Sequence, residues 1–210
     1  MSRMDITTIL LVRHAQTRSN IAGRYMGWID EDLSEEGIWQ AEQLARRLEN
    51  RSIDFAYSSP LRRAYRTAEI IAAPHSIPVS PIEGLGEIRI GDWEGMYAVE
   101  IEANFPDMWR VWRSDPSSFQ MPGGESLAEV GERAIASFED IAQANRGQQV
   151  LIVTHEVVVR LLVAYCLDVS FSIYRRIEVA NASLAVIQLV DGRRRLRLLN
   201  DIGHLEIRQY

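Results

Sequence analysis

Residues 8–14 read TILLVRH, an apolar run that ends abruptly in two polar residues. An uninterrupted apolar run rich in β-branched residues is typical of a strand buried on both faces, as in the parallel sheet of an α/β protein. Arg13 and His14 therefore stand at the carboxyl end of the predicted strand. Two further strands are predicted at Phe55 to Ser58 and at Val150 to Val153, and polar residues follow each of them.

Helices are predicted around these strands by cap residues and by apolar residues at helical spacing. One helix begins after Ser34, and a second begins at Ser59, which is followed by proline at the first helical position. A third begins after Ser126, where Glu129 completes a capping box. Two late apolar stretches are predicted to form a hairpin, Ser183 to Leu189 and Leu196 to Leu199. Strands alternating with helices predict an α/β fold, a three-layer sandwich with a mostly parallel central sheet.

Length and composition predict one globular domain over residues 1–210. The chain is 47% hydrophobic and 25% charged, which suffices for one large core. The stretch 93–124 is rich in aromatic residues and lacks strand pattern, so we expect a small inserted lid there. The net charge of −6 argues against general binding to nucleic acid, and the single cysteine excludes an intrachain disulfide or a thiolate cluster.

The apolar run near the N-terminus bears on where the protein is found. Ile9 to Val12 is too short for the core of a signal peptide or for a membrane span. We therefore expect a cytoplasmic protein without a membrane partner. Whether the protein forms a homodimer is left open, because hydrophobic residues of an interface cannot be distinguished in the sequence from those of the core.

Basic side chains follow three of the predicted strand ends: Arg13 and His14, Arg62, and His155. Ligands of open α/β sheets bind in the crevice at the carboxyl ends of the strands. Gathering several cations there costs several kcal/mol for each charge unless an anion compensates them. Arginine matches phosphoryl oxygens two at a time, and the first turn of a helix, where Arg62 is expected, favours an anion. These residues predict a phosphate ligand.

Five motifs resemble, in the same order, those of the histidine phosphatase superfamily. They are LVRHAQTRSN, SSPLRRAYRTA, GEIRIGDWEG, PGGES and VTHEVVVR. The resemblance runs over nearly the whole chain. In the first motif Ala15 replaces the usual glycine, a small change that some members share and that does not imply lost activity.

The resemblance implies a phosphatase that hydrolyses small phosphomonoesters through a phosphohistidine on His14. Glu87 would be the proton donor, and neither a metal nor a cofactor would be needed. The other site residues that it implies are the phosphoryl-binding Arg13, Arg62 and His155 and the substrate-contacting Asn20 and Gly27. The partner would be a small phosphorylated metabolite.

Two alternatives come from other classes of protein. His14, His155 and Glu87 also fit a metal site of two histidines and one carboxylate. Arg13 and Arg62 argue against this site, because two fixed cations repel a divalent metal. A non-catalytic module that binds a phosphorylated ligand on the same fold is the other alternative, although all five chemical residues are present.

The closer alternative is a phosphoglycerate mutase of the same superfamily. Mutases resemble the chain in these motifs, but they are longer and have a larger insertion before the second histidine. Met26 and Ile90 stand where mutases place a hydroxyl residue and a tyrosine, so polar contacts are missing here. A mutase must protect its phosphohistidine from water, and the shorter insertion suggests an open, hydrolytic site. We therefore favour the phosphatase.

The substrate stays open between phosphoserine, sugar phosphates, phosphoglycerate derivatives and a broad range of monoesters. Arg110 and Arg113 could bind a carboxylate or a second phosphate, or they could be solvated. The aromatic residues of the lid fit packing better than recognition. His204 has three readings: it helps to close the site, lies in a subunit contact, or is structural.

Overall fold

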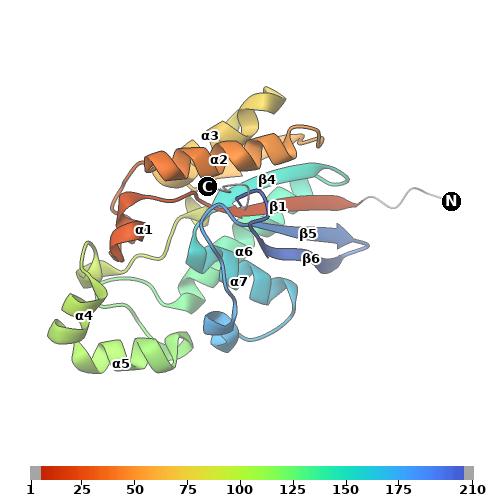
Figure 1. The fold of residues 1–210 in the computed structure, drawn as a ribbon. Coiled ribbons are helices and arrows are strands. Elements are labelled where there is room, and N and C mark those ends of the chain that lie inside the picture. The colour runs from red at the N-terminus through yellow and green to blue at the C-terminus, as the bar shows by residue number, and fades with distance from the viewer. Residues whose placement is uncertain (1–5, 206–210) are drawn as a thin grey trace.

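The computed structural model describes residues 6–205 as an α/β sandwich in three layers (Figure 1). The strands are β1 (Thr7–Arg13), β2 (Phe55–Ser58), β3 (Val79–Pro81), β4 (Gln149–Thr154), β5 (Leu184–Val190) and β6 (Arg193–Asp201). The helices are α1 (Arg18–Ala22), α2 (Glu35–Leu48), α3 (Arg62–Ala72), α4 (Ala98–Asn104), α5 (Pro106–Ser114), α6 (Leu127–Ala144) and α7 (Glu156–Cys166). The predicted fold class is confirmed.

Within the described residues, six strands form one sheet in the order β3-β2-β4-β1-β5-β6. The first four of these strands run parallel, and β5 pairs antiparallel with both β1 and β6. The strands predicted from the three apolar runs and the closing hairpin are all present. Because β1, β2 and β4 are parallel neighbours, their carboxyl ends meet at one edge of the sheet.

Helices cover both faces of the sheet and bury its side chains in two clusters. Helices α2 and α3 lie on one face, and α6 and α7 lie on the other (Figure 1). Side chains of β1 alternate between the clusters: Leu10 and Val12 pack with α2 and α3, and Ile9 and Leu11 pack with α6 and α7. The apolar run at residues 9–12 is thus buried on both faces, as a central strand requires.

The predicted helix starts hold at two positions and fail at a third. The Ser34 side chain accepts from the backbone N–H of Gly37, and Ser126 forms a capping box with Glu129. Helix α3, however, begins at Arg62 with Leu61 as its N-cap, and not at Ser59. The Ser59 hydroxyl instead accepts from the Leu61 N–H, so it stabilises the turn before the helix.

The aromatic stretch 93–124 forms α4, α5 and short 3₁₀ turns, placed at the end of the sheet toward which β1 runs (Figure 1). Trp93, Trp109, Trp112 and Phe119 are buried against one another, with Trp93 and Phe119 stacked at 5.4 Å between ring centroids. These rings mainly pack a small core of their own. That this segment acts as a lid stays a prediction. None of the described helices is long and apolar enough to span a bilayer.

Candidate active site

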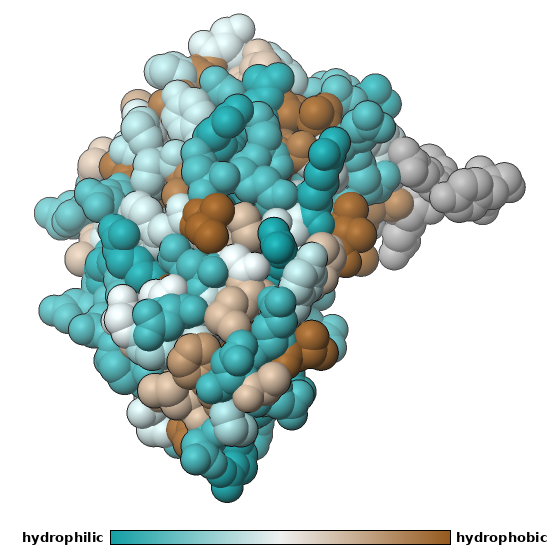
Figure 2. Space-filling view, turned by 90° about the vertical axis from the view of Figure 1, so that its left-hand side faces the viewer, coloured by the Kyte–Doolittle hydropathy of each residue, from teal (hydrophilic) through white to brown (hydrophobic). Residues whose placement is uncertain are grey.

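A cavity of about 380 Å³ lies at the carboxyl ends of the parallel strands. β1 ends at Arg13 opposite Thr154 of β4, so the residues after both strands reach the same place. The lining includes five of the expected site residues, Arg13, His14, Asn20, Gly27 and Glu87. The face at this end of the sheet is mostly hydrophilic, with small separate hydrophobic patches (Figure 2). This surface suits a small charged ligand.

His14 is held in one orientation and in one protonation state. Its backbone N–H donates to Thr154 at 2.8 Å, and its Nδ1 lies 2.7 Å from the carbonyl oxygen of Ala15. A carbonyl only accepts, so Nδ1 carries the proton and Nε2 keeps its lone pair. Burial, followed by the charges of Arg63 and Arg13, holds the pKa of His14 well below its ordinary value of 6.5. The imidazole is therefore neutral at neutral pH.

Two arginines flank His14 in the cavity, one partly buried and one fully buried. Arg13 donates to the carbonyl oxygen of Val179 at 2.6 Å and pairs with Glu156 at 2.9 Å. Arg63, only 4% exposed, donates to the carbonyl oxygens of Gly27 at 2.8 Å and Ile29 at 3.1 Å. Because these bonds fix both guanidinium groups, their remaining N–H groups are oriented before any ligand arrives.

The prediction that Arg62 joins this cluster is wrong. The Arg62 side chain is 65% exposed and pairs with Asp32 at 2.9 Å, away from the cavity lining. The neighbouring Arg63 lines the cavity in its place. Adjacent residues on a helix differ by about 100° in direction, so only one of the two can face the site. Arg63 lies one and two turns before the buried Thr67 and Ile71, and this spacing marks it as the inward residue.

His155 lies behind His14 and not in the cavity lining. It is fully buried, its ring centroid is 5.2 Å from that of His14, and its Nε2 is 2.7 Å from the Ser59 hydroxyl. Burial, followed by the charge of Arg63, lowers the pKa of His155 well below 6.5. Its Nδ1 has no hydrogen-bond partner among the described residues. The expected contact with a phosphoryl group is thus not pre-formed.

Glu87 lines the cavity with a perturbed carboxyl group. Burial raises the pKa of Glu87 above its ordinary value of 4.5, against the opposing effects of the Ile88 N–H and Arg63. The Ile88 N–H donates to its Oε1 at 2.9 Å. The sequence alone left open whether burial or nearby arginines dominate this pKa. In the structure burial prevails, so the carboxyl group keeps its proton to higher pH than a solvated glutamate.

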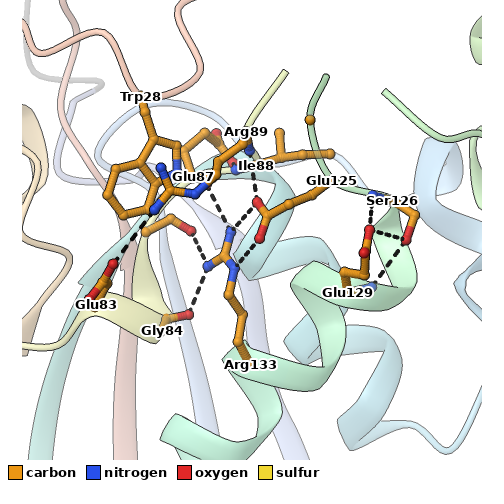
Figure 3. A network of polar contacts seen from close by, with 12 residues as sticks. Trp28, Glu83, Gly84, Glu87, Ile88, Arg89, Glu125, Ser126, Glu129 and Arg133 are labelled. Carbon is orange, nitrogen blue, oxygen red and sulfur yellow. Dashed lines mark hydrogen bonds and ion pairs between the residues drawn. The ribbon is translucent and has the colours of Figure 1, made fainter. Parts of the chain in front are cut away.

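A network of polar contacts holds the loop that carries Glu87 (Figure 3). Arg133 of α6 donates to the carbonyl oxygens of Gly84 at 3.0 Å, Gly86 at 2.7 Å and Glu87 at 2.8 Å. The same guanidinium group makes a two-pronged ion pair with Glu125, at 2.8 and 2.9 Å. One arginine thus binds three backbone carbonyl groups of the loop, and the Glu125 carboxylate fixes the orientation of that arginine.

Three further contacts belong to the same network. The Trp28 Nε1–H donates to the Glu87 carbonyl oxygen at 2.5 Å, and the Arg89 guanidinium lies 3.6 Å from the centroid of the Trp28 ring. Glu125 also accepts from the Arg89 backbone N–H at 2.8 Å. The backbone of Glu87 is therefore held from both sides while its side chain faces the cavity. Sequence reasoning noted the PGGES turn but missed Arg133 and Trp28.

Asn20 and Gly27 contribute polar groups and space to the cavity. The Asn20 Oδ1 accepts from the Thr17 N–H at 3.0 Å and from the Asn181 Nδ2 at 3.1 Å, so its own Nδ2 is directed away from these partners as a donor. Gly27 has a φ of 49°. A Cβ there would also collide with Ile90 and Glu94, so the close approach of the chain requires glycine.

The further arginines that line the cavity are not the two considered from the sequence for a carboxylate or a second phosphate. Arg110 and Arg113 of α5 do not line it. Arg24, Arg160 and Arg175 do, and the sequence analysis did not single them out. Arg175 lies in the last part of a 3₁₀ segment, Phe171–Arg176, for which periodicity gave no signal.

His204 also lies away from the cavity, beside Arg47 in a separate shallow hollow. It is 5% exposed, which agrees with a structural role better than with closure of the site. Within residues 6–205, no three His, Cys, Asp or Glu side chains are grouped to hold a metal ion. His14, His155 and Glu87 therefore do not form the metal triad considered from the sequence.

Fold and cavity together define a class: an α/β protein of the phosphoglycerate mutase-like kind, with a cationic site for phosphoryl groups. The sequence profile of the histidine phosphatase superfamily (branch 1) matches residues 9–202. The chain belongs to this superfamily, as its motifs predicted, and is a phosphatase-type hydrolase.

Relatives and solved structures agree with this assignment. Phosphoserine phosphatase 1 of Hydrogenobacter thermophilus is 37% identical over 94% of this chain and 93% of its own length. The metal-independent phosphoserine phosphatase of Arabidopsis thaliana is 35% identical over 96% of this chain and 84% of its own. The structure of Bacillus stearothermophilus YhfR superposes with a TM-score of 0.92 at 33% identity, covering 95% of this chain and all of that one.

An enzyme with a bound substrate is also similar. A mutant phosphoserine phosphatase of Entamoeba histolytica, solved in complex with phosphoserine, superposes with a TM-score of 0.84 at 27% identity. The comparison covers 95% of this chain and 99% of that one. Phosphatases of small phosphorylated metabolites thus share the whole fold of this protein.

Proposed function

We propose that the protein hydrolyses small phosphomonoesters through a phosphohistidine formed on Nε2 of His14, with Glu87 as proton donor. The observation that carries this proposal is the state of His14. Its Nδ1–H is bound to the Ala15 carbonyl at 2.7 Å, so the unprotonated Nε2 is the nitrogen available to the cavity. A histidine in this state can attack phosphorus without first losing a proton.

In the first half of the reaction, Nε2 of His14 attacks phosphorus and the bond from phosphorus to the ester oxygen breaks. Arg13 and Arg63 would neutralise the phosphoryl oxygens, which is the main requirement of a loose transition state. Arg63 takes the role that the sequence assigned to Arg62. Glu87 gives its proton to the departing oxygen, so an alcohol leaves instead of an alkoxide.

In the second half, water attacks the phosphohistidine. Ionised Glu87 accepts a proton from the water, the bond between phosphorus and Nε2 breaks, and inorganic phosphate is released. The neutral imidazole and the protonated carboxyl group are both restored. Because Glu87 must be protonated for the first half, we expect turnover of alkyl esters to fall as the pH rises through its raised pKa.

Hydrolysis is favoured over mutase activity by the cavity wall. Met26 and Ile90 both line the cavity, at positions where mutases place a hydroxyl residue and a tyrosine. Asn20 and Gly27 line it as well, and they are proposed to contact the substrate. The relatives named phosphoserine phosphatase support a small phosphorylated metabolite as substrate.

The test is turnover of p-nitrophenyl phosphate in excess chelator by the wild type and by His14→Ala. We expect turnover that resists chelator and is lost in the variant, together with an acid-labile, alkali-stable phosphoprotein in rapidly quenched wild type. Turnover that is lost to chelator, or that persists in His14→Ala, would contradict the mechanism. A wild type that transfers phosphate between two positions of a phosphoglycerate faster than to water would favour the mutase.

A further inference from the structure

The cavity carries more positive charge than a phosphate group requires. Five arginines and two glutamates line it, which leaves three positive charges when His14 is neutral and both glutamates are ionised. A phosphomonoester dianion compensates two of them. The uncompensated positive charge is larger when Glu87 is protonated, the state in which it acts as proton donor. An unbalanced cation in a narrow site favours a ligand with a further negative charge.

The partners of the five arginines show which one is available for that charge. Arg13 and Arg160 share the carboxylate of Glu156, at 2.9 and 2.7 Å. Arg63 is buried beside His14 and belongs to the phosphoryl end. Only two lining arginines are then left without an acidic partner among the described residues, Arg24 and Arg175.

Arg175 is the better placed of these two. Its Nη2 donates to the carbonyl oxygen of Trp112 at 2.5 Å, and its guanidinium lies 5.3 Å from the Trp112 ring centroid and 6.0 Å from that of Tyr174. These contacts fix the guanidinium without neutralising it. Arg24 is exposed, and its guanidinium lies 4.8 Å from the ring centroid of Tyr97. Partial burial, with Arg113 and Arg160 nearby, lowers the pKa of Arg175, as expected for a cation that lacks a counter-charge.

We propose that Arg175 forms a second anion subsite in the lining of the cavity, and that the preferred substrates are phosphomonoesters that carry a carboxylate. The carboxylate would accept from the guanidinium N–H groups that Trp112 leaves free. This inference rests on the proposed function, because it assumes that the phosphoryl group lies between His14, Arg13 and Arg63.

The apolar part of the lining narrows the class further. Met26, Ile88, Ile90, Met121 and Val157 line the same cavity and offer no side-chain hydrogen bonds. The carbon chain of a short acidic monoester can pack against these side chains while its charged groups bind the arginines.

The test compares two ligands that differ in the proposed group alone, 3-phosphoglycerate and glycerol 3-phosphate, the second having a hydroxymethyl group in place of the carboxylate. Binding is measured by calorimetry in a His14→Ala background, so the result does not depend on turnover. We expect 3-phosphoglycerate to bind about tenfold more tightly, equivalent to about 1.4 kcal/mol. Adding Arg175→Gln should reduce this preference to less than about twofold and leave glycerol 3-phosphate binding within about twofold.

Arg176→Gln is the matched control, because it removes the same charge from the next residue, which does not line the cavity. It should retain the preference. Equal binding of both ligands before Arg175 is changed would overturn the inference. So would an equal loss for both ligands in Arg175→Gln, or the same loss of preference in Arg176→Gln. Failure of the proposed function would appear separately, as wild type without turnover of p-nitrophenyl phosphate.

Discussion

Replacing Arg133 with methionine tests whether the network in Figure 3 positions the proton donor. Methionine keeps much of the side-chain length but removes the donors to the carbonyl oxygens of Gly84, Gly86 and Glu87 and to the Glu125 carboxylate. Arg133 does not line the cavity, so the substitution leaves the phosphoryl-binding groups in place. Any specific effect on catalysis must pass through the loop.

The contacts set the expected size of the effect. Breaking a well-formed, largely buried ion pair costs about 3–5 kcal/mol of stability, and the low end applies because the Arg133 side chain is 22% exposed. The Trp28 Nε1–H still holds the Glu87 carbonyl oxygen at 2.5 Å, so the loop is loosened and not released. A misplaced catalytic group of this kind costs about 100-fold in rate, against about 10⁴-fold at most for complete loss of the proton donor.

The assay compares two leaving groups. An alkyl phosphate such as glycerol 3-phosphate needs a proton on its departing oxygen, whereas p-nitrophenolate leaves without one. We expect kcat/KM of Arg133→Met, which reports the first half of the reaction alone, to fall about 100-fold with the alkyl ester and less than about threefold with p-nitrophenyl phosphate. Glu87→Gln should show the same selectivity with a larger loss. In the Glu87→Gln background, Arg133→Met should add little further loss, because the group that it positions is gone.

Arg47→Met is the control for general destabilisation. It breaks a comparable two-pronged pair, Arg47 with Asp201 at 2.8 and 2.5 Å, that has no contact with the Glu87 loop. Urea unfolding measures both variants, which should lose similar stability, while only Arg133→Met loses alkyl ester turnover selectively. Equal losses with both substrates, or the same selectivity in Arg47→Met, would refute a positioning role for Arg133.

Three further substitutions test separate parts of the account. Arg63→Met should lower kcat/KM with p-nitrophenyl phosphate by about 100-fold or more, whereas Arg62→Met should change it by less than about twofold. A larger loss in Arg62→Met than in Arg63→Met would contradict the placement of these arginines. A Cβ at Gly37 would overlap the carbonyl of Gln16 in the loop after His14, so Gly37→Ala should cost about 1–3 kcal/mol in urea unfolding; an unchanged midpoint would show that the loop yields easily. Burial and the neighbouring arginine lower the pKa of His204 to about 4, so the unfolded chain takes up a proton at this position below its ordinary value of 6.5 before the native state does. The contribution of His204 to the free energy of unfolding should therefore be fully present above about pH 6.5 and be lost as the pH falls toward 4. His204→Gln should reduce this loss by up to about 3 kcal/mol. Unfolding curves measured across that pH range test this expectation.

Much of the fold could be predicted because its signals are local. The apolar runs that became β1 and β4 are largely buried on both faces, as an uninterrupted apolar run predicts. The side chains of Ser34 and Ser126 cap their helices through neighbours three residues away. Ser59 misled the prediction because a serine followed by proline also suits the turn before a helix.

The candidate site was predicted less completely. The sequence supplied His14, Arg13, Glu87, Asn20 and Gly27, all of which line one cavity. Their motifs place polar residues at strand ends, and parallel topology then brings strand ends together.

The sequence by itself therefore determined the sheet, the superfamily and the residue types of the site. Tertiary structure alone decided that Arg63 and not Arg62 faces the cavity, since the direction of a helical residue depends on where the helix begins and which side packs on the sheet. It also decided that Arg133 holds the Glu87 loop and that Arg175 lines the cavity. Both act across long separations in the chain, where no local spacing can report which groups meet.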